Sequence, residues 1–147
     1  MPFESVSEEN VIEHYRKNNG NVTQIITGFI ASNLNGETTT LGRNGSNYTA
    51  SLIANFLNAE EFQNYTHVSG IYTANPDLVE NSKKIEKLSY QEANEMANFG
   101  ANILHAKTII PLIEKNIPLR ILNTFDPENP GTLIGAESEQ GGYAGKF

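Results

Sequence analysis

The stretch LGRNGSNYTA, residues 41–50, decides how this chain is interpreted, because a glycine-rich loop runs directly into an apolar helix there. The start of a helix leaves backbone N–H groups unpaired and carries partial positive charge, so it suits a phosphate or a carboxylate. Glycine lets the backbone approach such an anion closely, and Ser46 is a good N-cap with a spare hydroxyl. An ordinary loop-to-helix turn that binds nothing explains the same residues, so both interpretations stay open at this level.

The segments on either side of this loop predict a strand, a hairpin and a helix. Val22 to Ala31 is rich in β-branched residues and predicts a buried strand. The turn signal at 33–36 and a second strand at Glu37 to Leu41 would complete a hairpin. After the loop, the helix is expected from Ala50 to Leu57. Its buried side is predicted to carry Leu52, Ile53, Phe56 and Leu57.

The rest of the chain alternates between strand and helix signals, which predicts an α/β domain with a largely buried sheet. Ser89 and Glu92 have the spacing of a capping box, so a helix is expected from there to Gly100. A capped helix is also expected from Ser7 to Gly20, and another at 107–116 with Ile109, Ile110, Leu112 and Ile113 apolar. Strands are predicted at 61–68, 118–123 and 131–134, and a turn-rich surface loop at 69–82.

Bulk composition excludes several classes of function. The 147 residues carry a formal net charge of -7, which argues against nucleic acid or an anionic membrane as a partner. There is no cysteine, and His14, His67 and His105 lack metal-ligand spacing, so we expect no protein metal site. No apolar run reaches membrane-spanning length and the first residues lack signal-peptide features, so we expect a cytoplasmic protein.

Three segments, in this order, resemble aspartate kinases of the amino-acid kinase family. They are TTTLGRNGSNYTA (38–50), YTHVSGIYTANP (65–76) and LSYQEANEMANFGANILHA (88–106). The third, followed by IPLRILNTFDPENPGTLI, is the most specific. The form GRNGS, and LIGAES after the last strand, look most like the kinase part of bifunctional aspartokinase–homoserine dehydrogenases. The resemblance covers roughly residues 22–136.

The resemblance implies transfer of the γ-phosphoryl of ATP, with Mg²⁺, to the side-chain carboxylate of L-aspartate, on the route to threonine, methionine and lysine. Arg43 would pair with the substrate carboxylate, because a planar guanidinium matches that group in a bidentate manner. Ser46 and Asn47 would also face the reacting groups. Nucleotide contacts are implied for Gly42, Gly45, Thr66, His67, Tyr72, Asn75 and Asn102, with position 77 at the phosphate end.

Several residues depart from the family pattern. Asn47 and His67 stand where the family usually has Asp, Asn75 and Asp77 replace Asp and Arg, and Asn102 replaces a Lys. These changes keep a second hypothesis open, in which the chain is a degenerate kinase module with a structural or regulatory role beside a dehydrogenase. A kinase acting on glutamate or on a nucleoside monophosphate fits the three segments less well.

The resemblance also sets an expectation for domain organisation. The family's Lys-Phe-Gly-Gly motif is absent, so residues 1–136 would be the C-terminal, nucleotide-side half of a three-layer α/β sandwich of amino-acid kinase type. Residues 137–147 are predicted to be a disordered tail. An isolated half would be inactive in phosphoryl transfer, and its unpaired apolar strand surface would favour a homo-oligomer.

Overall fold

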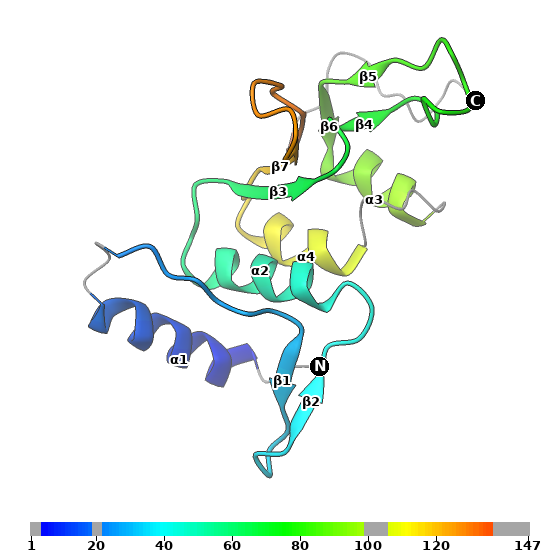
Figure 1. The fold of residues 1–147 in the computed structure, drawn as a ribbon. Coiled ribbons are helices and arrows are strands. Elements are labelled where there is room, and N and C mark those ends of the chain that lie inside the picture. The colour runs from blue at the N-terminus through cyan, green and yellow to red at the C-terminus, as the bar shows by residue number, and fades with distance from the viewer. Residues whose placement is uncertain (1–3, 19–21, 99–105, 137–147) are drawn as a thin grey trace.

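The computed structural model describes residues 4–18, 22–98 and 106–136 (Figure 1). Four helices and eight strands lie within these ranges. The helices are α1 (Glu4–Lys17), α2 (Gly45–Phe56), α3 (Tyr90–Asn98) and α4 (Ala106–Glu114). The strands are β1 (Ile30–Ser32), β2 (Thr38–Thr40), β3 (Phe62–Thr66), β4 (Ile71–Tyr72), β5 (Lys84–Ile85), β6 (Lys87–Ser89), β7 (Leu119–Asn123) and β8 (Thr132–Gly135).

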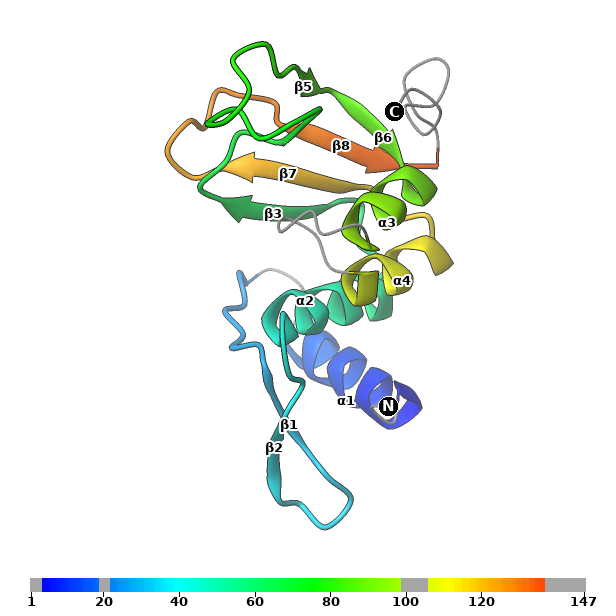
Figure 2. The ribbon, with the colours of Figure 1, turned by 90° about the vertical axis from the view of Figure 1, so that its right-hand side faces the viewer.

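The central element is a mixed four-stranded sheet with the order β3-β7-β8-β6. β3 is parallel to β7 and β6 is parallel to β8, while β7 and β8 are antiparallel. α2, α3 and α4 lie together beneath this sheet, and α1 lies against α2 on its far side (Figure 2). The predicted α/β class is therefore confirmed.

The core lies between the sheet and the helix layer. Leu88, Leu119, Ile121 and Ile134 point from the strands, and Ile109 and Leu112 from α4, and all are fully buried. Burial of each such side chain is worth about 1.5–3 kcal/mol, which explains why the strands predicted at 61–68, 118–123 and 131–134 form close to the expected positions as β3, β7 and β8.

Two polar contacts fix helix ends in this core. The Ser89 hydroxyl accepts a hydrogen bond from the Glu92 amide (3.1 Å), and the Glu92 carboxylate accepts one from the Ser89 amide (2.8 Å), so the predicted capping box is confirmed. The buried Asn55 side chain of α2 donates to the Pro111 carbonyl (2.7 Å) within α4. That carbonyl lies near the end of α4, where helix carbonyls need partners from outside the helix.

The prediction for residues 22–31 is wrong for most of its length. Only Ile30–Ser32 forms a strand, β1, which pairs with β2 as the predicted hairpin. Residues 22–28 form no strand, and Val22, Ile25 and Ile26 are exposed. A buried strand needs a neighbour on its edge, and none of the described strands pairs with this segment.

Other element predictions need smaller corrections. α1 begins at Glu4 and ends at Lys17, earlier than the predicted range. The buried residues of α2 beyond its start are Ser51, Ala54, Asn55 and, as predicted, Phe56, whereas the predicted Leu52, Ile53 and Leu57 are only half-buried. Ile110 and Ile113 of α4 are exposed. The predicted loop at 69–82 contains β4, which pairs with β5.

An ion pair joins β7 to the residue before β3. The Arg120 guanidinium contacts both carboxylate oxygens of Glu61 at 3.0–3.2 Å, and both side chains are mostly buried. These hydrogen bonds from Arg120 lower the pKa of Glu61 below its ordinary value of 4.5, against the opposing effect of burial. The pair ties the start of β3 to its neighbour β7.

The lowered pKa of Glu61 predicts a specific response to acid. A depressed carboxyl pKa contributes stability above the ordinary value of 4.5 that is lost as the pH falls through the folded-state pKa. Glu61→Gln should therefore lower the free energy of unfolding near neutral pH by on the order of 1 kcal/mol, and should flatten its fall below pH 4.5. Urea denaturation at a series of pH values measures both effects. The exposed neighbour variant Glu60→Gln is the control, and an equal flattening in that variant would contradict the assignment.

Candidate functional site

The loop before α2 is a tight turn that only certain residues can form. Gly42 has φ +77° and Asn44 has φ +57°, both in the left-handed region. Glycine enters that region without steric cost, and asparagine is one of the few other residues that does so readily. The Gly45 amide donates to the Gly42 carbonyl (3.0 Å), which closes the turn. Arg43 lies at the tip of this turn and is exposed.

The first turn of α2 is open to an anion. Among the described residues, the cap residue Asn44 makes no side-chain capping hydrogen bond, and the first turn of the helix has no acidic residue. The Tyr48 amide makes the first helical hydrogen bond, to the Asn44 carbonyl (3.0 Å), so the amides of Ser46 and Asn47 precede the helical ladder. The predicted N-cap role of Ser46 is wrong, because Asn44 occupies the cap in a left-handed conformation and Ser46 lies inside the helix. Because the first turn of α2 has no acidic residue, no negative side chain of this turn offsets the positive end of the helix dipole.

A neighbouring segment holds this first turn in place. The Thr49 hydroxyl accepts a hydrogen bond from the Phe29 amide (3.2 Å) and donates one to the Gly45 carbonyl (3.0 Å). The Leu41 amide donates to the Phe29 carbonyl (2.9 Å). A Cβ atom on Gly28 would lie 2.8 Å from the Cα of Ser46. The loop and the helix start are thus fixed by backbone packing that leaves no room for a methyl group.

A second group of predicted residues lies where β3 and β7 end. The two strands are parallel, so their carboxyl ends meet at one edge of the sheet, where α/β proteins commonly bind ligands. The Thr124 amide donates to the Thr66 carbonyl (2.9 Å), and the Asn123 side chain donates to the Ser69 hydroxyl (2.9 Å). Thr66 is half-buried and His67 is exposed.

Tyr72 lies in β4, which follows the end of β3 in the chain and pairs with β5. The buried Thr132 hydroxyl accepts a hydrogen bond from the Ile71 amide (2.8 Å) and donates one to the Ile85 carbonyl (2.6 Å), which anchors both strands of the hairpin to β8. Tyr72 is half-buried. Asn75 is exposed, and its side-chain oxygen accepts a hydrogen bond from the Asp77 backbone amide (3.0 Å). The Asn75 side chain therefore stabilises the turn in which it lies. Asn102 lies outside the described residues.

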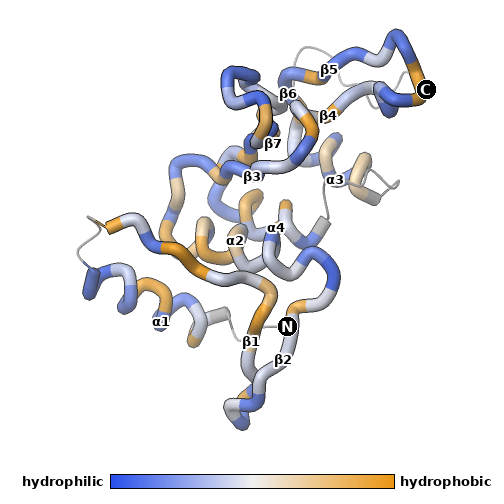
Figure 3. The backbone as a smooth tube through the Cα atoms, in the orientation of Figure 1, coloured by the Kyte–Doolittle hydropathy of each residue, from blue (hydrophilic) through white to orange (hydrophobic). Residues whose placement is uncertain are grey.

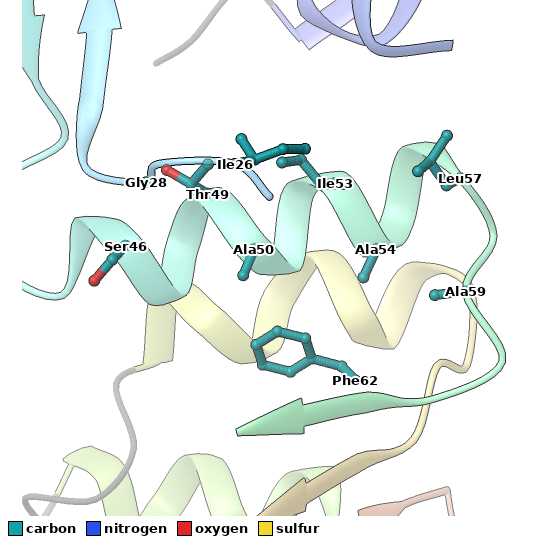
Figure 4. A pocket seen from close by; sticks show the side chains of 10 residues that line it. All are labelled: Ile26, Gly28, Ser46, Thr49, Ala50, Ile53, Ala54, Leu57, Ala59 and Phe62. Carbon is teal, nitrogen blue, oxygen red and sulfur yellow. The ribbon is translucent and has the colours of Figure 1, made fainter. Parts of the chain in front are cut away.

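The two groups of residues face the same side of the molecule. α2 begins on the side at which β3 ends, as Ser46 and the tip of β3 show in Figure 4 and as the ribbon shows in Figure 2. The structure thus orients the Gly42–Asn47 loop and the Thr66–His67 strand end toward one region.

Phe125 is a feature of this region that the sequence analysis missed. Its side chain is 84% exposed, directly after β7. The Asn123 side chain accepts a hydrogen bond from the Phe125 amide (2.9 Å), so Phe125 is held in a tight turn beside Thr66 and Ser69. Its chain neighbours Asn123 and Thr124 are the residues that contact Ser69 and Thr66. An asparagine that ends a strand and is followed by Thr-Phe-Asp-Pro is a turn signal that could have identified this turn.

Among the described residues there is no group of three or more His, Cys, Asp or Glu side chains that could hold a metal ion. Magnesium that arrives with a nucleotide needs few protein ligands, because phosphate oxygens and water supply most of its coordination. The donor set of this region therefore fits Mg²⁺ only as part of a magnesium–nucleotide complex. In the described part of the chain, no helix is long and apolar enough to span a membrane.

Comparison with known proteins defines the class of this fold. The sequence profile of the amino acid kinase family matches residues 3–123. A crystal structure of E. coli aspartokinase III in complex with aspartate and ADP superposes with a TM-score of 0.88 and 38% identity, over 95% of this chain and 31% of that one. UMP kinase from Bacillus anthracis, 20% identical with a TM-score of 0.57, shares the fold alone. The chain belongs to the amino acid kinase family, and the predicted type of fold is confirmed.

Within that family, the similar proteins include aspartokinases of two kinds. The aspartokinase of Chlamydia pneumoniae is 43% identical over 119 residues, which are 81% of this chain and 27% of that protein. Lysine-sensitive aspartokinase 3 of E. coli is 44% identical over 78% of this chain and 26% of its own length. The bifunctional aspartokinase/homoserine dehydrogenase of Haemophilus influenzae is 44% identical over 75% of this chain and 14% of its own. The chain thus spans about a quarter of the monofunctional relatives.

The close contact between residue 28 and α2 predicts a strong dependence on glycine. Gly28→Ala would place a methyl group 2.8 Å from the Cα of Ser46, so the loop or the helix start must shift. We expect the free energy of unfolding to fall by about 1–3 kcal/mol, measured by urea denaturation. Gly135→Ala is the matched control, because its Cβ would meet nothing within 4 Å. Equal losses in the two variants would contradict the packing account.

Proposed function

We propose that this chain is a portion of an aspartate kinase, which transfers the γ-phosphoryl group of ATP to the side-chain carboxylate of L-aspartate in threonine, methionine and lysine biosynthesis. The observation that carries the proposal is the uncapped start of α2 beside the exposed Arg43. An aspartate carboxylate would accept hydrogen bonds from the Ser46 and Asn47 amides and pair with the Arg43 guanidinium. The similarity to an aspartokinase crystallised with aspartate and ADP supports this assignment.

The nucleotide would bind at the carboxyl ends of β3 and β7. Gly42 and Gly45 would let the backbone approach the phosphates, and Thr66, His67, Tyr72 and Asn75 would face the nucleotide, as the family resemblance implies. In the transfer, an aspartate carboxylate oxygen forms a bond to the γ-phosphorus while the bond from that phosphorus to the β,γ-bridging oxygen breaks, which releases ADP. The role of this chain's residues is to bind and orient the two reactants and to stabilise charge.

The isolated chain is expected to be inactive in this reaction, since it spans only about a third of the aspartokinase III chain it superposes on. A cytoplasmic location also stays a prediction.

The alternative function, a degenerate module that supports an attached dehydrogenase, is favoured by one specific observation. Asp77 is an exposed carboxylate in the turn that Asn75 stabilises, and a carboxylate near a polyphosphate opposes binding.

Calorimetric titration of Mg-ATP separates these two functions. The proposal predicts saturable binding to the native chain, and tighter binding to a variant that carries Asp77→Arg and Asn102→Lys, because two positive side chains would then face the phosphates. Together the two substitutions change the charge by three units, which near a polyphosphate should alter the affinity by roughly tenfold or more. Binding by the variant but not by the native chain would establish the degenerate module instead. A Lys83→Arg variant, which preserves the charge of a neighbouring exposed residue, serves as the control.

Phe125 gives an additional prediction for the nucleotide. A base that stacks on an exposed aromatic ring gains about 1–3 kcal/mol, so Phe125→Ala should weaken Mg-ATP binding by about 5- to 150-fold. Binding of magnesium tripolyphosphate, which has no base, should be unchanged, and Phe125→Tyr should bind like the native chain. The same calorimetric titration measures all three. An equal loss for ATP and tripolyphosphate would show that Phe125 acts on the loop rather than on the base.

A further inference from the structure

The β4–β5 hairpin carries Tyr72 and Asn75, two of the residues in the proposed nucleotide site, but little of its own structure holds it in place. Only two residues of each strand pair, and residues 73–84 are exposed or half-buried. Figure 3 shows this part of the hairpin mostly in hydrophilic colours. A two-stranded hairpin is at best marginally stable on its own in water. The position of Tyr72 therefore depends on the contacts that hold the hairpin against the rest of the molecule.

The inner end of the hairpin is anchored in the core. Ile71 and Ile85 are almost fully buried, and the Thr132 hydroxyl bonds to the backbone of both residues. Tyr72 and Lys84, the next pair of residues outward, are only half-buried. The core anchor thus ends one residue pair before the part of the hairpin that would contact the nucleotide.

Lys84 provides a contact beyond this anchor. Its Nζ donates a hydrogen bond to Oδ1 of Asn129 at 2.7 Å, which joins the hairpin to the turn between β7 and β8. Both side chains are half-buried, and among the described residues no ion pair involves Lys84. A hydrogen bond from a charged donor is roughly twice as strong as one between neutral groups. This contact is therefore the polar tie that holds the outer part of the hairpin.

The acceptor of this hydrogen bond is itself fixed. The Asn129 side chain also accepts a hydrogen bond from the Gly131 amide (3.1 Å) and donates one to the Asp126 carboxylate (3.0 Å). Asp126 directly follows Phe125 in the chain. The tie from Lys84 thus ends in the same turn that carries the exposed ring of Phe125.

The register of the hairpin relates this tie to Tyr72. Lys84 lies directly opposite Tyr72 in the antiparallel pair, and side chains of directly opposed residues lie on the same face of a sheet. Because Lys84 reaches Asn129 from that face, the face that carries Tyr72 is turned toward the β7–β8 turn.

We propose that Lys84 is a positioning residue for the nucleotide. Through Asn129 it holds the β4–β5 hairpin against the β7–β8 turn, so that Tyr72 and Phe125 are in place before the base binds. This inference rests on the proposed function, and it requires no contact between Lys84 and the nucleotide. Loss of the tie lowers the fraction of molecules in which the base site is formed, and the apparent affinity falls in the same proportion.

Calorimetric titration of Mg-ATP into the native chain and Lys84→Met tests the inference. Methionine keeps the long apolar side chain but removes the charged donor. The dissociation constant should rise roughly tenfold, as expected for the loss of one hydrogen bond to a charged group. Lys84→Arg keeps a charged donor and should restore most of the affinity. Lys83→Met is the matched control, because it removes the same charge from the exposed neighbouring residue, and it should bind Mg-ATP like the native chain.

A double-mutant cycle separates positioning from a direct contact with the phosphates. Asn129→Ala should also weaken Mg-ATP binding, and Lys84→Met should then add less than about a twofold further loss, because the tie is already broken. Three outcomes would overturn the inference alone: unchanged affinity in Lys84→Met, an equal loss in Lys83→Met, or a full further loss when Lys84→Met is added to Asn129→Ala. A native chain that binds no Mg-ATP would overturn the proposed function and this inference with it.

Discussion

The close approach of residues 28–29 to the first turn of α2 is the constraint on which the candidate site depends. Gly28 packs against Ser46, and a Cβ on Gly45 would lie 2.9 Å from the ring of Phe29. The Thr49 hydroxyl then bridges the Phe29 amide and the Gly45 carbonyl. These contacts hold the helix start, where the amides of Ser46 and Asn47 precede the helical ladder and the Arg43 side chain is exposed.

The same contact explains why the chain has both a defined site and an unpaired segment. Residues 28 and 29 are held by α2 and by Leu41, so the chain before them crosses the helix instead of joining the sheet. The result is an anion-receptive helix start at one end of the crossing and an exposed apolar run at the other.

Local sequence signals predicted the elements whose stability is local or whose side chains are buried. The Ser89–Glu92 capping box and the hairpin around the turn at 33–36 form as expected, because a few neighbouring residues determine them. The strand at 22–31 could not be predicted correctly, since a strand requires a partner that the sequence does not reveal. The two-residue pairing of β4 with β5 depends on a distant residue, Thr132.

For the candidate site, the sequence predicted which loop to consider but not its geometry. It assigned the cap of α2 to Ser46, whereas Asn44 is the cap residue in a left-handed conformation and the helix begins at Gly45. It identified Thr66 and His67 from resemblance, and the structure adds Ser69, Asn123 and Phe125 from the adjoining turns. The contact between Asn123 and Ser69 joins segments 54 residues apart in the chain, which no local pattern could indicate.

The most direct test of the central claim is an NMR titration of the ¹⁵N-labelled chain with L-aspartate, alongside the Arg43→Ala variant. The account predicts that the amide signals of Gly45, Ser46 and Asn47 shift progressively with aspartate concentration, and that these shifts are lost in the variant. Unchanged signals at these three residues, or equal shifts in the two proteins, would contradict the claim that the start of α2 and Arg43 form an aspartate site.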